Sequence, residues 1–201
     1  TSGGKMKKLN ILLLADIHYV GTANHICNLK DRKTKLALEL IQRVIQSVDM
    51  DKIDVIFLMG DLVDNGDAPG AEDDMKLINS EIKKTEKPVI VVPGNHDHCA
   101  QMVFEIFDDY EGLHEIEGYQ IVTFADEYCK NDVAVRSIEK MEKAFSGVDS
   151  GRPVITLQHN PIYPYIDSPY PYNLRNANEV MEYYAQKGVT LSVSGHAHWG
   201  I

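Results

Sequence analysis

The sequence predicts an α/β domain built on a parallel β-sheet, and two observations carry that prediction. Short, nearly continuous apolar runs recur along the chain, as expected for strands that are covered on both faces. Segments with apolar residues at helical spacing separate the first three runs, and a strand–helix–strand–helix–strand order favours parallel pairing. A chain of 201 residues is long enough to bury a substantial core in one domain.

The first half of the chain predicts three strands and two helices. The strands are expected at residues 9–15, 53–59 and 88–92. The first helix is expected at residues 33–48, and its inward face would be formed by Leu36, Leu40, Val44 and Val48, with Ala37, Ile41 and Ile45 beside them. The second helix is expected at residues 71–84, with Met75, Ile78 and Ile82 inward.

The second half of the chain predicts a second sheet. Residues 119–124 and 132–135 are expected to be strands of this sheet. Two further apolar runs predict strands at 153–157 and 189–193. Helices are expected at residues 101–109, 137–145 and 178–186.

Charge and cysteine content restrict the class of protein. The net charge of −10 argues against long-range attraction to nucleic acid or to an anionic membrane. Cys27, Cys99 and Cys129 contain no CxxC pair, which argues against structural zinc and fits reduced thiols. No apolar stretch is long enough to span a membrane. We therefore expect a cytoplasmic protein without nucleic-acid or membrane partners, and its oligomeric state stays open.

Five polar motifs follow predicted strands. They are Asp16-Ile17-His18, Gly60-Asp61-Leu62-Val63-Asp64, Gly94-Asn95-His96-Asp97, Gln158-His159-Asn160-Pro161 and Gly195-His196-Ala197-His198. Ligands of open α/β sheets sit beyond the carboxyl ends of the strands, so these residues are expected to converge. Carboxylates, imidazoles and one amide carbonyl are suitable ligands for divalent cations. The set predicts a hydrolase that acts on a phosphoester with two metal ions.

Each motif alone has a plainer interpretation. Asp, Asn and Gly are common turn formers at strand ends, and alternating histidines can simply lie at the surface. A coincidence would require all five motifs to follow predicted strands by chance, so we adopt the metal-site interpretation for the whole set. Asp64 fits a supporting or loop-capping role better than direct ligation. His98, His25 and His114 are expected at the surface, with His25 near enough to line a pocket.

The motifs resemble the signature of the calcineurin-like metallophosphoesterases, which runs D-x-H, G-D-x-x-D, G-N-H-D/E, H and G-H-x-H. All five blocks occur in order from Asp16 to His198. The resemblance implies two facing mixed β-sheets flanked by helices, in a four-layer sandwich. It implies a single domain over residues 6–201, with residues 1–5 as an expression remnant. Family domains continue beyond the last motif, so we expect either a truncated domain with an incomplete second sheet or a minimal version.

The resemblance also implies a role for each site residue. Asp16, His18 and His198 would hold the first metal, Asn95, His159 and His196 the second, and Asp61 would bridge both. A bridging hydroxide would be the nucleophile, His96 would protonate the leaving group, and Asp97 would orient or charge-tune His96. The expected cofactors are two divalent ions, with Mn²⁺, Fe²⁺ and Zn²⁺ left open.

Two features bear on the substrate. Segment 161–172 reads PIYPYIDSPYPY and is either an ordered surface loop or a rim that stacks on a base, sugar or aryl group. No arginine cluster is evident for a dianionic monoester, since the later half offers only Arg136, Arg152 and Arg175. We therefore expect a small-molecule, nucleotide-like phosphoester, diesters slightly ahead of monoesters, and a similarity to class III cyclic-nucleotide phosphodiesterases. A noncatalytic scaffold and a mononuclear hydrolase are the alternatives.

Overall fold

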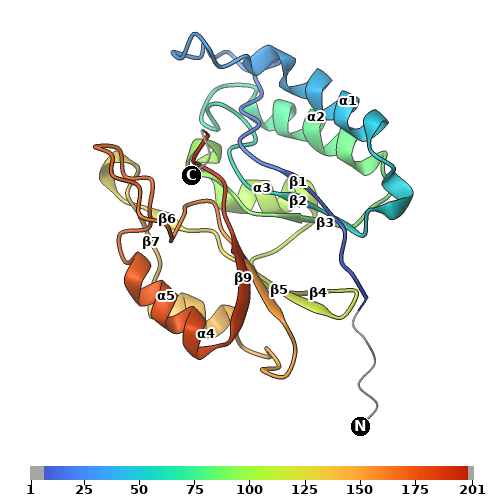
Figure 1. Ribbon diagram of the computed structural model, residues 1–201. Helices are drawn as coiled ribbons and strands as arrows, with labels where there is room; N and C mark the ends of the chain where they lie inside the picture. Colours follow the sequence, from blue (N-terminus) through green and yellow to red (C-terminus); the bar gives the residue numbers. More distant parts are fainter. Residues whose placement is uncertain (1–6, 199–201) are drawn as a thin grey trace.

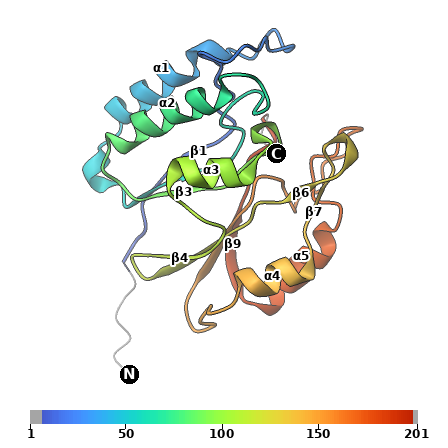
Figure 2. The same cartoon turned by 180° about the vertical axis from the view of Figure 1, so that it is seen from behind.

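The computed structural model describes residues 7–198 as four layers, in the order helices, sheet, sheet, helices (Figures 1 and 2). One outer layer contains α1 (Ala37–Ser47), α2 (Ala71–Lys83) and α3 (Ala100–Phe107). The other contains α4 (Ile138–Ala144) and α5 (Ala177–Gln186). The predicted α/β fold with two facing sheets flanked by helices is confirmed. The predicted domain start at residue 6 and the remnant at residues 1–5 lie outside the described residues.

The first sheet is parallel throughout. Its order is β1-β2-β3, formed by Ile11–Leu14, Val55–Leu58 and Val89–Val91. Successive side chains of a strand point to opposite faces. In the central strand β2, Ile56 and Leu58 therefore pack under the helices, whereas Phe57 faces the second sheet. All four β2 residues are fully buried, which explains why the sequence of this strand is continuously apolar.

The second sheet is mixed. Its order is β4-β5-β8-β9, formed by Gly112–Ile116, Tyr119–Thr123, Val154–Leu157 and Val189–Val193. β4 and β5 form an antiparallel hairpin, whereas β8 and β9 run parallel to β5. The sequence did not predict β4. Its hairpin turn consists of Glu117 and Gly118, both with positive φ (50° and 86°), as a two-residue turn between twisted strands requires.

Two expectations in this half are wrong. The predicted strand at residues 132–135 is only the two-residue β7 (Ala134–Val135), which pairs with β6 (Glu127–Tyr128) in a separate ribbon. His114 is not at the surface, because β4 places its ring under Tyr110, with the two ring centroids 4.2 Å apart.

Three apolar clusters fill the spaces between the four layers. Met75, Ile78 and Ile82 of α2 are fully buried against the first sheet, as predicted. In α1 the inward face differs from the prediction. Ala37 and Ile41 are buried, whereas Leu40, and Leu36 in the turn just before the helix, are 54% and 49% exposed. Within residues 7–198, no helix combines the length and the apolar character needed to cross a membrane.

Candidate metal centre

The first two motifs meet because pairing between β1 and β2 continues beyond the ends of both strands. The Asp16 N–H donates to the Gly60 carbonyl at 3.1 Å, and the His18 N–H donates to the Asp61 carbonyl at 2.8 Å. Parallel strands end at the same edge of a sheet, so the two polar segments are delivered side by side. The predicted convergence of these motifs is present in the structure.

The last two motifs join this edge from the second sheet. The Gly195 N–H donates to the His159 carbonyl at 3.0 Å. The His196 N–H donates to the Asp16 carboxylate, 2.9 Å from Oδ1. This bond links the first motif to the last and closes the site across the two sheets.

Four of the predicted site residues have left-handed backbone conformations. They are Asp16 (φ 53°), His18 (48°), Asp61 (50°) and His196 (71°). Such a conformation costs of order 1–3 kcal/mol at a non-glycine residue and persists only where the surroundings fix it. Strain concentrated at one edge indicates that the direction of these side chains is strongly determined by the fold.

Two glycines allow the motifs to approach one another. A Cβ added at Gly60 would lie 2.4 Å from His159 Nδ1, and one at Gly94 would lie 2.2 Å from Asp61 Oδ1. Gly60 also has a φ of 86°, which a larger residue adopts only with strain. These positions therefore require glycine, because any side chain would push the candidate ligands apart.

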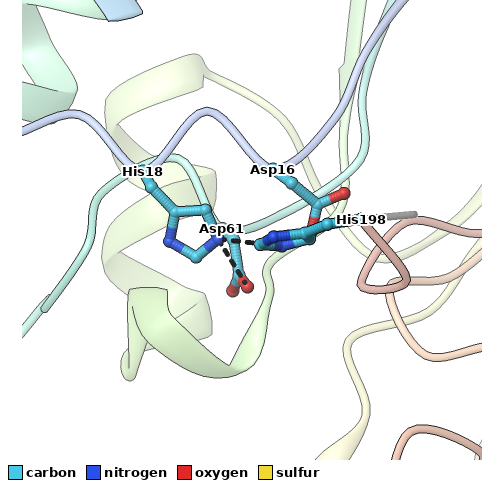
Figure 3. A group of neighbouring side chains, drawn as sticks. All are labelled: Asp16, His18, Asp61 and His198. Carbon is cyan, nitrogen blue, oxygen red and sulfur yellow. Dashed lines mark hydrogen bonds and ion pairs between the residues drawn. The ribbon is translucent and has the colours of Figure 1, made fainter. Parts of the chain in front are cut away.

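A first cluster brings together Asp16, His18, Asp61 and His198, whose ligand atoms all lie within 4.8 Å of one another. Figure 3 shows the two imidazole rings on either side of the Asp61 carboxylate. His18 Nε2 is 3.4 Å from Asp61 Oδ2 and 3.2 Å from His198 Nε2. His198 Nε2 is 3.2 Å from Asp16 Oδ1. His18 and Asp61 are buried, whereas His198 is exposed.

A second cluster contains Asp61, His159 and His196. His159 Nε2 lies 3.2 Å from Asp61 Oδ2 and 3.1 Å from His196 Nδ1. Asp61 Oδ2 therefore faces both clusters.

Asn95, the remaining predicted ligand, lies in the turn next to these clusters. Its neighbour His96 donates its N–H to Asp61 Oδ1 at 2.9 Å. Asn95 Oδ1 is buried and has no hydrogen-bond partner within the described part of the chain. A buried amide oxygen without a partner is costly, and a cation would satisfy it.

The second cluster requires a positive charge. His159 Nδ1 lies 2.8 Å from the Met59 carbonyl oxygen, which can only accept, so Nδ1 carries a proton. In a neutral ring, Nε2 would then direct a lone pair at the Asp61 carboxylate. Burial lowers the pKa of His159, but Asp61 outweighs this effect and raises it to about 9. A proton or a metal ion can supply the charge, and carboxylates with several imidazoles fit Mn²⁺, Fe²⁺ or Zn²⁺.

The protonation state of His18 differs from that of His159. Burial lowers its pKa to about 3, so the ring is neutral near pH 7, as a metal ligand must be. Its Nδ1 lies 3.3 Å from Asp64 Oδ1. If the Nε2 lone pair binds a cation, Nδ1 carries the proton and Asp64 accepts it, as carboxylates commonly do behind metal-bound histidines. Asp64 thus lies where the supporting role expected from the sequence places it.

The His96 ring lines a cavity beside the first cluster. Its Nδ1 is 2.6 Å from the Asp64 carbonyl oxygen, and the ring packs edge-on to His18 with centroids 4.6 Å apart. The carbonyl accepts the Nδ1 proton, which leaves Nε2 as the nitrogen available for proton transfer.

Asp97 does not have the contacts expected for it. Its carboxylate accepts N–H bonds from Leu62 (2.8 Å), Val63 (3.2 Å) and Gly94 (2.8 Å), and makes none to His96 within residues 7–198. The side chain is fully buried, and burial followed by the charge of Asp61 raises its pKa to about 7. Asp97 therefore fixes the second motif to the third, and the Asp64 carbonyl orients the His96 ring.

The cavity over the two clusters has a volume of about 560 Å³. From the proline- and tyrosine-rich segment, Tyr170 and Tyr172 line it, whereas Tyr163 and Tyr165 are 73% and 76% exposed. His25 lines it as well.

The sequence predicted no arginine cluster at the pocket, but the structure places one arginine there. Arg136 is fully buried in an ion pair with Asp126, 2.7 Å from Nε to Oδ1, and Arg152 pairs with Glu115. Arg32 lines the cavity instead. Arg32 was not predicted as a site residue, because its only signal in the sequence is its position in the loop after the first motif.

The fold and site define a metallophosphoesterase-type protein, and comparison with known proteins gives the family. The family model for calcineurin-like phosphoesterase matches residues 9–200, so the chain belongs to this family.

Two curated relatives are similar to the chain. A probable cyclic nucleotide phosphodiesterase of Fibrobacter succinogenes is 25% identical over 96% of this chain and 73% of its own. A probable glycerophosphodiester phosphodiesterase, GpdQ, of Arcobacter nitrofigilis is 33% identical over 32% of this chain and 22% of its own.

Solved structures share the fold. A dimetal phosphatase from Danio rerio superposes with a TM-score of 0.69 at 14% identity, covering 94% of this chain and 82% of that one. Protein TT1561 of Thermus thermophilus superposes with a TM-score of 0.61 at 16% identity, covering 92% and 80%.

Proposed function

We propose that this protein hydrolyses phosphoesters with two divalent metal ions, phosphodiesters ahead of monoesters. The observation that carries the proposal is the position of Asp61 Oδ2, which lies 3.4 Å from His18 Nε2 and 3.2 Å from His159 Nε2. A carboxylate that faces two ligand clusters is suited to bridging two ions, and two adjacent ions are suited to an in-line displacement at phosphorus. The two relatives named as phosphodiesterases support the diester preference.

The ligand assignment follows the two clusters. Asp16, His18 and His198 would hold one ion, Asn95, His159 and His196 the other, and Asp61 both. When bound, such ions supply Lewis acidity and lower the pKa of water. We keep Mn²⁺, Fe²⁺ and Zn²⁺ as candidates, because the mixed carboxylate, imidazole and amide donors suit all three.

His96 would donate the proton to the leaving oxygen. Its Nδ1 is occupied by the Asp64 carbonyl at 2.6 Å, so the proton would leave from Nε2. We place Asp97 in a structural role beside it, on the ground of its three backbone N–H bonds.

A phosphomonoesterase is the second candidate, and Arg32 is the observation that favours it. The preference for diesters drew on an apparent lack of arginine near the pocket, and Arg32 lines the cavity. A guanidinium group suits the dianion of a monoester.

We also propose that residues 6–201 form one domain. A cytoplasmic location is proposed because all three cysteines are free thiols, which fits a reducing compartment.

The test is metal-reconstituted hydrolysis. The protein is stripped of metal, reloaded with Mn²⁺, and assayed on bis-p-nitrophenyl phosphate and p-nitrophenyl phosphate while bound metal is counted. We expect two ions per chain and faster cleavage of the diester, with Ca²⁺-loaded protein as the inactive control. Faster monoester cleavage would support the second candidate. Two ions without turnover of either ester would indicate a noncatalytic scaffold.

A further inference from the structure

We propose that Arg32 determines substrate specificity by binding a second phosphate group, one that the substrate carries beyond its reacting phosphate. The inference deepens the function proposed above and rests on it. The substrate class is therefore a phosphoester with two phosphate groups, of nucleotide size.

The distance of Arg32 from the clusters points to a second group. Arg32 Nη1 lies 3.2 Å from His18 Nδ1, while Nε2 on the other side of that ring lies 3.4 Å from Asp61 Oδ2. An imidazole ring thus separates the guanidinium from the candidate metal cluster. The guanidinium is therefore displaced from the cluster, on the far side of the His18 ring, where we infer that it meets a group attached to the phosphate held at the cluster.

Arg32 keeps donors for an anion. Within residues 7–198 its guanidinium donates from Nη1 to Asp64 Oδ1 at 2.7 Å, and its 3.2 Å contact with His18 Nδ1 also involves Nη1. A guanidinium has five N–H donors, so the Nε and Nη2 donors remain for a planar, bidentate contact with a phosphate. The single charge of Asp64 is also shared with His25 at 2.8 Å and with His18 at 3.3 Å. Asp64 therefore positions Arg32 through Nη1.

The loop that carries Arg32 is held in place before any ligand binds. Fully buried Asp74 of α2 accepts the N–H groups of Gly21 (2.9 Å), Thr22 (2.6 Å) and Ala23 (3.1 Å) at one end of the loop. Asp64 holds Arg32 at the other end. A pre-organised arginine loses little conformational entropy on binding, which distinguishes it from an ordinary surface arginine.

The rest of the cavity fits a nucleotide. Among the described residues that line it, Arg32 is the only arginine or lysine. Tyr170 and Tyr172 supply aromatic surface beside His196, with ring centroids 5.7 Å and 5.2 Å from the His196 ring. A volume of about 560 Å³ is within the range of small-ligand sites.

The test is a calorimetric titration of Mn²⁺-loaded protein with thymidine 5′-phosphate, thymidine 5′-diphosphate and thymidine 3′,5′-bisphosphate. In the wild type we expect at least one two-phosphate ligand to bind about tenfold or more tighter than the monophosphate. Arg32→Gln should reduce that gain to less than about threefold with both metals retained. Arg32→Lys should keep part of the gain, because lysine preserves the positive charge but lacks the planar, bidentate geometry of a guanidinium. The control is Arg43→Gln, whose exposed guanidinium pairs with Glu39 on α1 and should leave the gain unchanged.

Three outcomes would overturn the proposal: no gain for either two-phosphate ligand, a gain that survives in Arg32→Gln, or an equal loss for all three ligands accompanied by loss of metal. The last result would show that Arg32 only supports Asp64. If Arg32→Gln does not fold, Arg32→Lys decides, since a full wild-type gain in that variant would also contradict the proposal. The titration reports affinity and hydrolysis is assayed separately, so an Arg32-dependent gain in a protein that hydrolyses nothing would refute the proposed function alone.

Discussion

The His159 ring is fixed between the Asp61 carboxylate, 3.2 Å from Nε2, and the Met59 carbonyl, 2.8 Å from Nδ1. Both neighbours are acceptors, so the ring is stabilised when it is protonated or when Nε2 faces a metal ion. Proton and metal are therefore expected to compete at this position.

The first prediction concerns the pH dependence of the metal-free protein. The pKa of His159 in the folded state is about 9, above the ordinary value of 6.5. A raised pKa contributes stability that is fully present below pH 6.5 and is lost as the pH rises to 9, with a magnitude on the order of 3 kcal/mol. We expect the melting temperature of the stripped protein to fall across this window while its affinity for Mn²⁺ rises. His159→Gln should flatten the stability profile, and a pH-independent profile in the unmutated protein would contradict the prediction.

The second prediction is that Asp61→Asn impairs both metal sites. The amide cannot carry the charge that faces both clusters. Metal content should fall from two ions to at most one, and kcat/KM by more than about 100-fold, since even a residue that only supports a ligand contributes about 10–100-fold. Elemental analysis of the purified variant measures this, with the exposed Asp49→Asn as control. Retention of both ions would show that Asp61 does not bridge them.

The third prediction separates proton donation from metal binding. His96→Ala should keep both ions but slow the hydrolysis of alkyl esters by roughly 10²–10⁴-fold, because an alkoxide needs a proton as it leaves. The p-nitrophenyl ester, whose leaving group is stable as an anion, serves as the control in the same variant and should lose much less activity. Lowered metal stoichiometry in His96→Ala would make the assignment of roles wrong.

The fourth prediction concerns stability away from the site. Arg136 pairs with Asp126 through two bonds, 2.7 Å and 2.8 Å, contacts the Tyr184 hydroxyl and lies 3.9 Å from the centre of the Phe124 ring. Arg136→Met would leave a buried carboxylate without a counter-charge and should cost about 3–5 kcal/mol in urea unfolding. The folded fraction should still bind two ions. Replacing Asp126 by Asn in the same chain should restore part of the loss, and an additive further loss would be inconsistent with a charge effect.

The fold and most of the site could be predicted because their signals are local. Apolar runs locate the strands, and Asp16 and Asp61 follow the ends of β1 and β2, which parallel pairing brings to one edge. His159 follows the end of β8 in the second sheet. The β4 strand escaped prediction because its sequence, Gly-Leu-His-Glu-Ile, shows no continuous apolar run and becomes a strand only by pairing with β5.

The partners of Asp97 and Arg32 were decided by the tertiary structure. The Asp97 carboxylate bonds to N–H groups of Leu62 and Val63, and such a contact leaves no mark in either local sequence. Arg32 belongs to a loop without periodicity, and only the carboxylates of Asp74 and Asp64 fix where that loop lies.

The sequence by itself thus determined most of the strands and helices and the identity of the candidate metal ligands, since apolar periodicity and strand ends depend on neighbouring residues. The tertiary structure alone decided which side chains orient those ligands and which arginine lines the cavity. Those choices depend on hydrogen bonds between distant segments, which form only when the two sheets and their loops are packed together.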